Sequence, residues 1–178
     1  MVGVDHLNNI EQALIDNLRL GTFSTITAGS KTTATAWSDS DVTVYGQFPT
    51  TEEVKYPAII TEMVANGIET QFMGQELTDS DGDAAIGELY GVGFNIYLMI
   101  DRDSSITVSG APYRQRRLLN YLMLNSANIL MDMNWVGASP STEVEGRNFS
   151  GFREMGYNPQ LETWNAMASM IITFKNAR

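Results

Sequence analysis

The amino-acid sequence predicts an α+β domain, an antiparallel β-sheet with two α-helices packed on one face. Residues 6–19 and 112–133 repeat apolar side chains at helical spacing. Residues 89–100 and 163–174 alternate large apolar residues with small or polar ones, as strands do. The elements follow one another as helix, strands, helix and strands. No repeat or linker divides the chain, so we expect a single domain over 1–178.

Composition narrows the range of functions. Hydrophobic residues make up 43% of the chain, which is enough for a substantial core. The absence of cysteine excludes disulfides, thiol nucleophiles and cysteine-based zinc sites. The net charge of −10 makes a dedicated nucleic-acid ligand unfavourable, because phosphates are repelled. Only 18% of residues are charged, so much of the surface is neutral and polar, and such a surface is less costly to bury against another protein than a charged one.

The sequence contains no apolar run of the ~20 residues that a membrane-spanning helix needs. The N-terminal residues lack a basic region followed by an apolar one, so we expect no signal peptide.

The N-terminal part is predicted to be a helix followed by an arm. Apolar residues recur from Leu7 to Leu18, with Asp5 as a capping residue and Gly21 ending the helix. The next stretch, 22–41, is rich in Thr, Ser and Ala and has few large apolar residues. Thr favours strands and the AGS in its middle can turn, so this arm is expected to be a β-hairpin or a long loop.

A short strand is predicted at 42–48, followed by a polar connection and the stretch KYPAIITEM at 55–63. Pro57 lacks an N–H and suits the first residue of a strand or an edge. Neither face of this strand is cleanly polar, so both are expected to be at least partly covered.

The next residues predict a hairpin. AsnGly at 66–67 is a strong turn signal, and 68–73 are expected to return antiparallel. Residues 74–88 are expected to form an acidic loop before the long apolar strand.

The second helix is expected to begin at Pro112, which suits a first helical turn, with Ser109 or Gly110 before it as the cap. A loop at 134–142 and a strand within 143–156, with a turn at Gly151 or Gly156, are expected to follow.

No motif predicts catalysis, a cofactor or a metal. AGSKTT at 28–33 lacks the glycines and the preceding buried strand of a phosphate-binding loop. GVGFNI at 91–96 lacks the third glycine of a dinucleotide fingerprint and lies inside a strand. The acids of DSDGD, 79–83, do not follow the calcium-loop spacing and predict a solvated turn. His6, the only histidine, has no supporting motif. We therefore expect that the protein is not an enzyme.

A cluster of three arginines at the expected start of the second helix is a candidate contact with a partner. The helix dipole disfavours cations there, by roughly a few tenths of a kcal/mol each. Arg114, Arg116 and Arg117 are expected either to contact an acidic partner surface, including a neighbouring copy, or to pair with acids of the same chain such as Asp101 and Asp103.

Two tryptophans, Trp37 and Trp135, are further candidates for a subunit or partner interface, because exposed aromatic residues often anchor interfaces. The alternative for Trp135 is that it caps the end of the second helix as part of the core. Together with Trp164 they are also the candidate platforms of an alternative function, a carbohydrate-binding or small-ligand-binding module.

The order of these features resembles a known family. An amphipathic helix and a strand precede FPTTEEVKYPAIITEM, and QFMGQ, a long apolar strand, an Arg-rich helix start and a late strand pair follow. This organisation is similar to that of the tail-terminator and tail-completion proteins of tailed bacteriophages, which are small neck proteins near the head–tail joint. The residues that carry the likeness are Tyr56, Pro57, Ala58 and Ile59, a "YPAI" strand entrance after a short polar connection.

The resemblance implies a virion structural protein that is assembled in the host cytoplasm. It implies a homohexameric ring that caps the last ring of the tail tube and offers its other face to the head connector or adaptor protein. Its partners would be further copies of itself, the tail tube protein and the connector, with the sheath protein as another candidate, and no cofactor or membrane. DNA would pass through an acidic lumen without specific binding. Within the same class, a tube or baseplate component remains an alternative.

Overall fold

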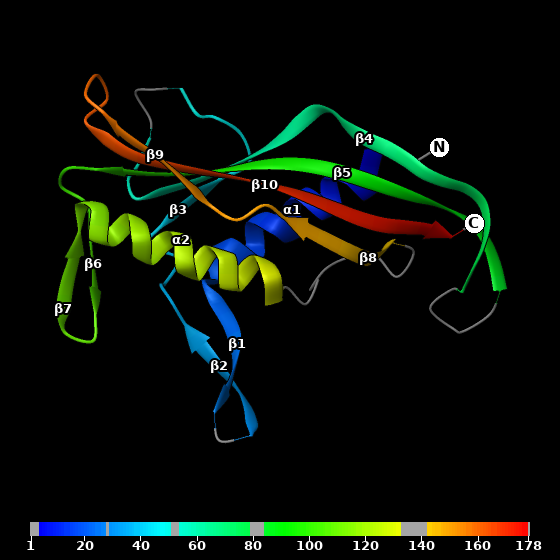
Figure 1. Cartoon of the computed structure of the whole chain (residues 1–178), viewed down its shortest axis with the longest axis horizontal. Coiled ribbons are helices and arrows are strands. Elements are labelled where there is room, and N and C mark those ends of the chain that lie inside the picture. The colour runs from blue at the N-terminus through cyan, green and yellow to red at the C-terminus, as the bar shows by residue number, and fades with distance from the viewer. Residues whose placement is uncertain (1–3, 28, 51–53, 79–83, 133–141, 178) are drawn as a thin grey trace.

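The computed structural model describes the backbone of residues 4–27, 29–50, 54–78, 84–132 and 142–177, and the side chains of 7–26, 29–50, 54–64, 90–132 and 146–174 (Figure 1). The described backbone contains two helices, α1 (Val4–Leu20) and α2 (Gln115–Asp132). The strands of the first half are β1 (Thr22–Thr27), β2 (Ser30–Thr35), β3 (Thr43–Tyr45), β4 (Ala58–Thr78) and β5 (Ala84–Asp101). Those of the second half are β6 (Ser105–Val108), β7 (Ala111–Arg114), β8 (Thr142–Phe149), β9 (Arg153–Asn158) and β10 (Thr163–Ala177).

Six strands form the main sheet in the order β3-β4-β5-β10-β8, with β9 pairing the other end of β10 (Figure 1). All of these pairs are antiparallel except β3 with β4, which is parallel. The central pair is the longest regular one, since β5 and β10 stay in register from Thr163 opposite Asp101 to Ala177 opposite Gly87. The predicted α+β class is therefore confirmed.

One face of β5 carries the core. The described residues on this face are buried without exception: Tyr90, Val92, Phe94, Ile96, Leu98 and Ile100. They pack in one cluster with the apolar residues of α1 and α2, such as Leu14, Leu18 and Leu122, so both helices cover this face. The opposite face of β5 and β10, which we call the open face, is only partly covered, as at Tyr97, Met99 and Ile171.

The first residues of β4 lie between two covered faces, as their sequence predicted. Ala58, Ile59, Ile60 and Thr61 are all fully buried, although their side chains alternate between the helix side and the open face. The PAII strand entrance is therefore a structural element of the core.

The Thr-rich arm is a β-hairpin formed by β1 and β2, the first of its two expected forms. It projects from the helix side of the molecule, away from the sheet (Figure 1). Its root is fixed at Trp37, whose Nε1 donates to the carbonyl of Leu18, 2.9 Å away, in the last turn of α1. Such terminal carbonyls have no partner inside the helix, so this bond satisfies a group that would otherwise be buried alone.

Two groups of Ala36 complete the root. Its N–H donates to the carbonyl of Gly21 over 2.8 Å, and its carbonyl accepts from the hydroxyl of Tyr121 on α2. These bonds fix the direction in which the arm leaves the domain, although the arm has no hydrophobic core of its own.

The expected turn at AsnGly 66–67 is wrong. Strand β4 continues through both residues, and its register against β5 shifts between Met63 and Ile68, which is a bulge. Asn and Gly favour bulges as well as turns, and the long strand β5 offers pairing partners on both sides of the irregularity. Consequently the expected return strand, 68–73, belongs to β4 itself. The expected acidic loop is also largely strand, because β4 extends through 74–78 and β5 includes 84–88. The residues between them, 79–83, lie outside the described backbone.

The expected start of the second helix is also wrong. Pro112 lies in β7 opposite Thr107, and Ser109 and Gly110 are the turn of the β6–β7 hairpin, with φ values of 50° and 79°. Positive φ at both central residues is typical of a two-residue hairpin turn. The helix begins three residues later, at Gln115.

The other end of the chain agrees better with expectation. Gly151, with a φ of 78°, lies between β8 and β9, in the predicted strand–turn region.

The first helix begins at Val4, so Asp5 lies within α1 and not before it as a cap. Neither helix of the described backbone is long and apolar enough to cross a membrane.

The root of the arm predicts the effect of Gly21→Ala. Gly21 has a φ of 59°, and a Cβ there would lie 2.5 Å from Cδ1 and 2.6 Å from the carbonyl oxygen of Trp37. The matched control is Gly110→Ala, since Gly110 also has a positive φ but open space around it. Both substitutions should lose about 1–2 kcal/mol from backbone strain, and Gly21→Ala roughly 1–3 kcal/mol more from overpacking. Urea unfolding measures this difference, and equal losses would contradict the proposed packing.

Candidate interaction surfaces

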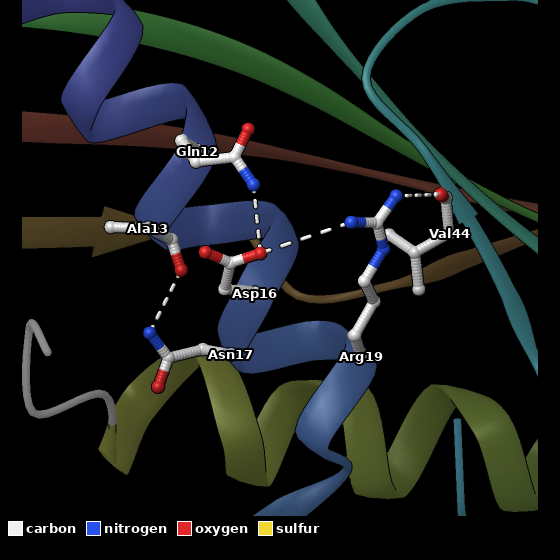
Figure 2. A network of polar contacts seen from close by, with 6 residues as sticks. All are labelled: Gln12, Ala13, Asp16, Asn17, Arg19 and Val44. Atoms are coloured by element: carbon white, nitrogen blue, oxygen red, sulfur yellow. Dashed lines mark hydrogen bonds and ion pairs between the residues drawn. The ribbon is translucent and has the colours of Figure 1, made fainter. Parts of the chain in front are cut away.

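A polar network holds α1 against β3 (Figure 2). Gln12 donates to Asp16 over 2.7 Å, Asp16 pairs with Arg19 at 3.8 Å, and Arg19 reaches the carbonyl of Val44 at 3.3 Å. A shallow hollow of about 430 Å³ beside it is lined by Asp16, Asn17, Arg19, Leu20 and Asp39. Because Asp16 and Arg19 already bond within the chain, we assign these residues to positioning α1.

The arginine cluster lies at the junction of β7 and α2, where the structure separates its members. Arg114 ends β7, and Gln115, with a φ of 50°, turns the chain into the helix. Arg116 pairs with Glu154 of β9 at 3.0 Å, and Arg117 lies over the ring of Tyr113, 3.9 Å from its centroid.

The arginines were expected to contact either a partner surface or acids of the same chain. Arg116 does pair within the chain, but with Glu154 and not with Asp101 or Asp103. Asp101 instead accepts hydrogen bonds from the N–H and hydroxyl of Ser104. Within the described side chains, Arg114 and Arg117 pair with no carboxylate and are exposed, so they stay candidates for a partner contact.

The expectation that Trp37 contacts a partner is wrong. It is 2% exposed and belongs to the core at the root of the arm, so it is equally unsuited as a carbohydrate platform. Trp164 packs against Tyr157 with ring centroids 4.5 Å apart. Trp135 lies outside the described residues.

An apolar groove of about 340 Å³ crosses the open face of the sheet. Its walls come from the connection after β3, from β5, and from β9, β10 and the turn between them. The lining residues are Phe48, Tyr97, Met99, Met155, Gly156, Tyr157, Asn158, Leu161, Asn165, Ala166 and Met167. We call this surface the open-face groove.

The walls of the open-face groove expose large apolar side chains. Phe48 packs on Tyr97 with centroids 4.8 Å apart, yet it remains 48% exposed, and Met155 and Leu161 are 62% and 47% exposed. On the floor, Oδ1 of Asn165 is buried and has no hydrogen-bond partner among the described groups. Such a concentration of exposed apolar residues is typical of an interaction site.

Carboxylates flank the groove. Glu62 accepts a hydrogen bond from the hydroxyl of Tyr97 over 3.3 Å, and Glu162 follows Leu161 in the chain. Burial, and then the charge and hydrogen bond of Glu62, raise the pKa of Tyr97 above its usual 10.0, so this phenol is a neutral donor. Arg153 lies opposite Met167, at the β9 side.

Little in the sequence predicts this groove. The alternation of Met155 and Tyr157 in β9 is a signal, but Phe48 and Leu161 lie in connections whose positions depend on the tertiary fold.

The arm is attached to α2 by a carboxylate. Asp132, the last residue of α2, accepts from the N–H and the hydroxyl of Ser24. Beyond this contact the hairpin is polar, with Thr25 and Thr32 hydroxyls 2.9 Å apart, and its only charged residue is Lys31. Ile26, opposite Lys31 near the tip, is 81% exposed.

The sequence motifs that only weakly resemble phosphate, dinucleotide or metal sites lie in ordinary secondary structure where they are described. Of AGSKTT, Ser30 to Thr33 lie in the second strand of the arm and Ala28 lies outside the described residues. GVGFNI lies within β5, between β4 and β10. His6 belongs to α1, but its side chain is outside the described part, as are the acids of 79–83. Where side chains are described, no group of three or more acidic or histidine residues is arranged to hold a metal ion.

No protein-family model matches the chain, and no curated protein matches it.

The Asp132 contact predicts how the arm responds to pH. Burial alone would raise the pKa of this carboxyl, but the hydrogen bonds from Ser24, with Lys31 and Arg147, lower it below 3.8. Its stabilising contribution is therefore complete above 3.8 and is lost as the pH falls through the lower folded-state pKa. We expect the protection of the arm amides, measured by hydrogen exchange relative to the intrinsic rate at each pH, to fall over that acidic range.

The control for this prediction is Asp132→Asn, which removes the titration and keeps an acceptor oxygen. It should show less protection at Ser24 at neutral pH and little further loss of protection on acidification. An unchanged pH profile in Asp132→Asn would mean that another group controls the arm.

Proposed function

We propose that the protein is a structural subunit of the neck of a tailed bacteriophage, a ring-forming tail terminator that caps the tail tube and joins it to the head connector. The observation that carries the proposal is the division of the fold into one compact core and hairpins that project from it (Figure 1). The YPAI strand entrance and the order of elements supply the link to the family, and the core position of Ala58 and Ile59 fits a scaffold role for this motif.

The β1–β2 hairpin supports assembly because, beyond its root, it buries little surface within its own chain. The β1–β2 and β6–β7 hairpins are each two-stranded sheets outside the main sheet. An isolated two-stranded hairpin is marginally stable in water, so a neighbouring subunit is a natural source of further contacts. The exposed apolar walls of the open-face groove supply a second surface that gains from being covered.

Charge supports the same role. With a net charge of −10, the surface of a ring would repel DNA that passes through its lumen. The low proportion of charged residues lowers the desolvation cost of the subunit contacts.

The test is the mass of the purified protein by light scattering over a concentration series, followed by particle imaging with and without tail tubes. A closed ring of about six times the 19.7 kDa subunit mass, formed alone or at tube ends, is the expected result. Open tubes of the protein itself would instead indicate a tube component, because a repeated head-to-tail contact that fails to close gives a filament. A monomer that ignores tail structures would contradict the proposal.

The arginine cluster predicts a salt-dependent contribution to assembly. Arg117→Glu should lower the fraction of rings at low salt, because its guanidinium is exposed and pairs with no carboxylate of the described residues. Arg102→Glu is the control, since this exposed residue makes the same change in net charge elsewhere. Light scattering at low and high salt distinguishes the variants, and equal behaviour would remove the cluster from the interface.

A further inference from the structure

We propose that the open-face groove binds the tip of the β1–β2 arm of a neighbouring copy, with Ile26 as the apolar anchor and Lys31 beside it. This inference rests on the proposed ring and adds to it the two surfaces that meet. It makes the subunit contact heterologous, with the arm of each copy in the groove of the next.

The arm cannot serve its own groove. It leaves the domain on the side covered by the helices (Figure 1). Tyr97 and Met99 of the groove alternate along β5 with its buried core residues, so they lie on the opposite face of the sheet. Its root is held there by Trp37 and by the contact between Ser24 and Asp132. An occupied groove therefore requires the arm of a second molecule.

The anchor at the arm tip and the walls of the groove are both apolar and exposed. Ile26 is a single large apolar side chain, 81% exposed, at the end of a polar hairpin, and the groove walls include Phe48, Met155 and Tyr157, which are 48%, 62% and 46% exposed. Methionine walls adapt to the shape of an inserted side chain. Covering both surfaces together removes apolar area from water that neither chain covers alone.

The charges of the two surfaces also favour the arm of a neighbouring copy as the occupant of the groove. The β1–β2 hairpin, 22–35, carries one charged residue, the cation of Lys31, while the chain as a whole has a net charge of −10. Two copies repel each other in general, so the cationic arm is the element that an acidic neighbour attracts. Lys31 is opposite Ile26 in the hairpin, which places it next to the anchor. Near the groove, Glu62 on the Tyr97 side and Glu162 after Leu161 are its candidate partners.

Cysteine cross-linking tests this contact directly, because the native chain has no cysteine and gives no background. Ile26→Cys and Met155→Cys are made as separate variants, mixed, and oxidised under the conditions of the assembly experiment. A disulfide needs Cα atoms about 4.4–6.8 Å apart, so it forms efficiently only where the arm tip reaches the groove. Leu124→Cys replaces Met155→Cys as the control, because Leu124 is equally exposed, at 64%, but lies on α2.

The expected result is a 26–155 dimer that forms about tenfold or more faster than the 26–124 dimer, in line with the geometric requirement. With both cysteines in one chain, oxidation should give a ladder that ends at the size of the ring, because a heterologous contact links every copy to the next. Absence of the 26–155 dimer, or equal rates for both pairs, overturns the inference.

A substitution at the anchor gives an independent measurement. Ile26→Asp should weaken self-association about tenfold or more, the effect of losing one buried aliphatic side chain. Thr35→Asp adds the same charge to the same hairpin face away from the tip and should change it by about threefold or less. Both positions are exposed, so circular dichroism should show an unchanged fold. Equal effects of the two variants would contradict the anchor.

The same samples separate this inference from the proposed function. Rings that cap tail tubes without a 26–155 cross-link leave the neck assignment intact and refute the arm contact. Cross-linked chains that form no ring and ignore tail tubes support the arm contact and refute the neck assignment.

Discussion

Burial of one face of β5 is the constraint on which the rest of the structure depends. The residues from Tyr90 to Ile100 on that face are covered by α1 and α2 together, and β4 and β10 pair with β5 on either side. Because both helices are used on this face, the open face is left to the connection after β3 and to β9. These short elements cover it incompletely, and the groove between Phe48, Met155 and Leu161 is the result.

The arm depends on the same core through its root. Trp37 binds the last turn of α1, and Tyr121 and Asp132 of α2 hold Ala36 and Ser24. A hairpin with no core of its own is in this way directed by two helices that are fixed on β5. Edge-to-face packing of Tyr113 on Tyr121, with ring centroids 5.2 Å apart, attaches the β6–β7 hairpin to the same region.

A rigid base with a polar, nearly uncharged projection is well suited to assembly. The side chains beyond Ser24 gain little from their own chain, so association with another subunit competes with few internal contacts. The arm and the open-face groove lie on opposite sides of one core, which is the arrangement that a head-to-tail ring requires. The proposed neck function and the proposed arm contact thus draw on one property of the fold, the separation of its core from its exposed surfaces.

The sequence by itself determined the class of fold, the two helices, the long apolar strands and the polar arm, because periodicity and composition act locally along the chain. It could not determine the bulge at 66–67, the β7 placement of Pro112 or the burial of Trp37. Asn-Gly, Pro and Trp are each compatible with two environments, and the long pairing of β4 with β5, the β6–β7 hairpin and the root of the arm decided among them. Only Arg116 of the candidate site residues found a carboxylate partner in the described chain, at Glu154. The groove was decided entirely by tertiary structure, since its walls come from segments far apart in sequence that meet only when the sheet forms.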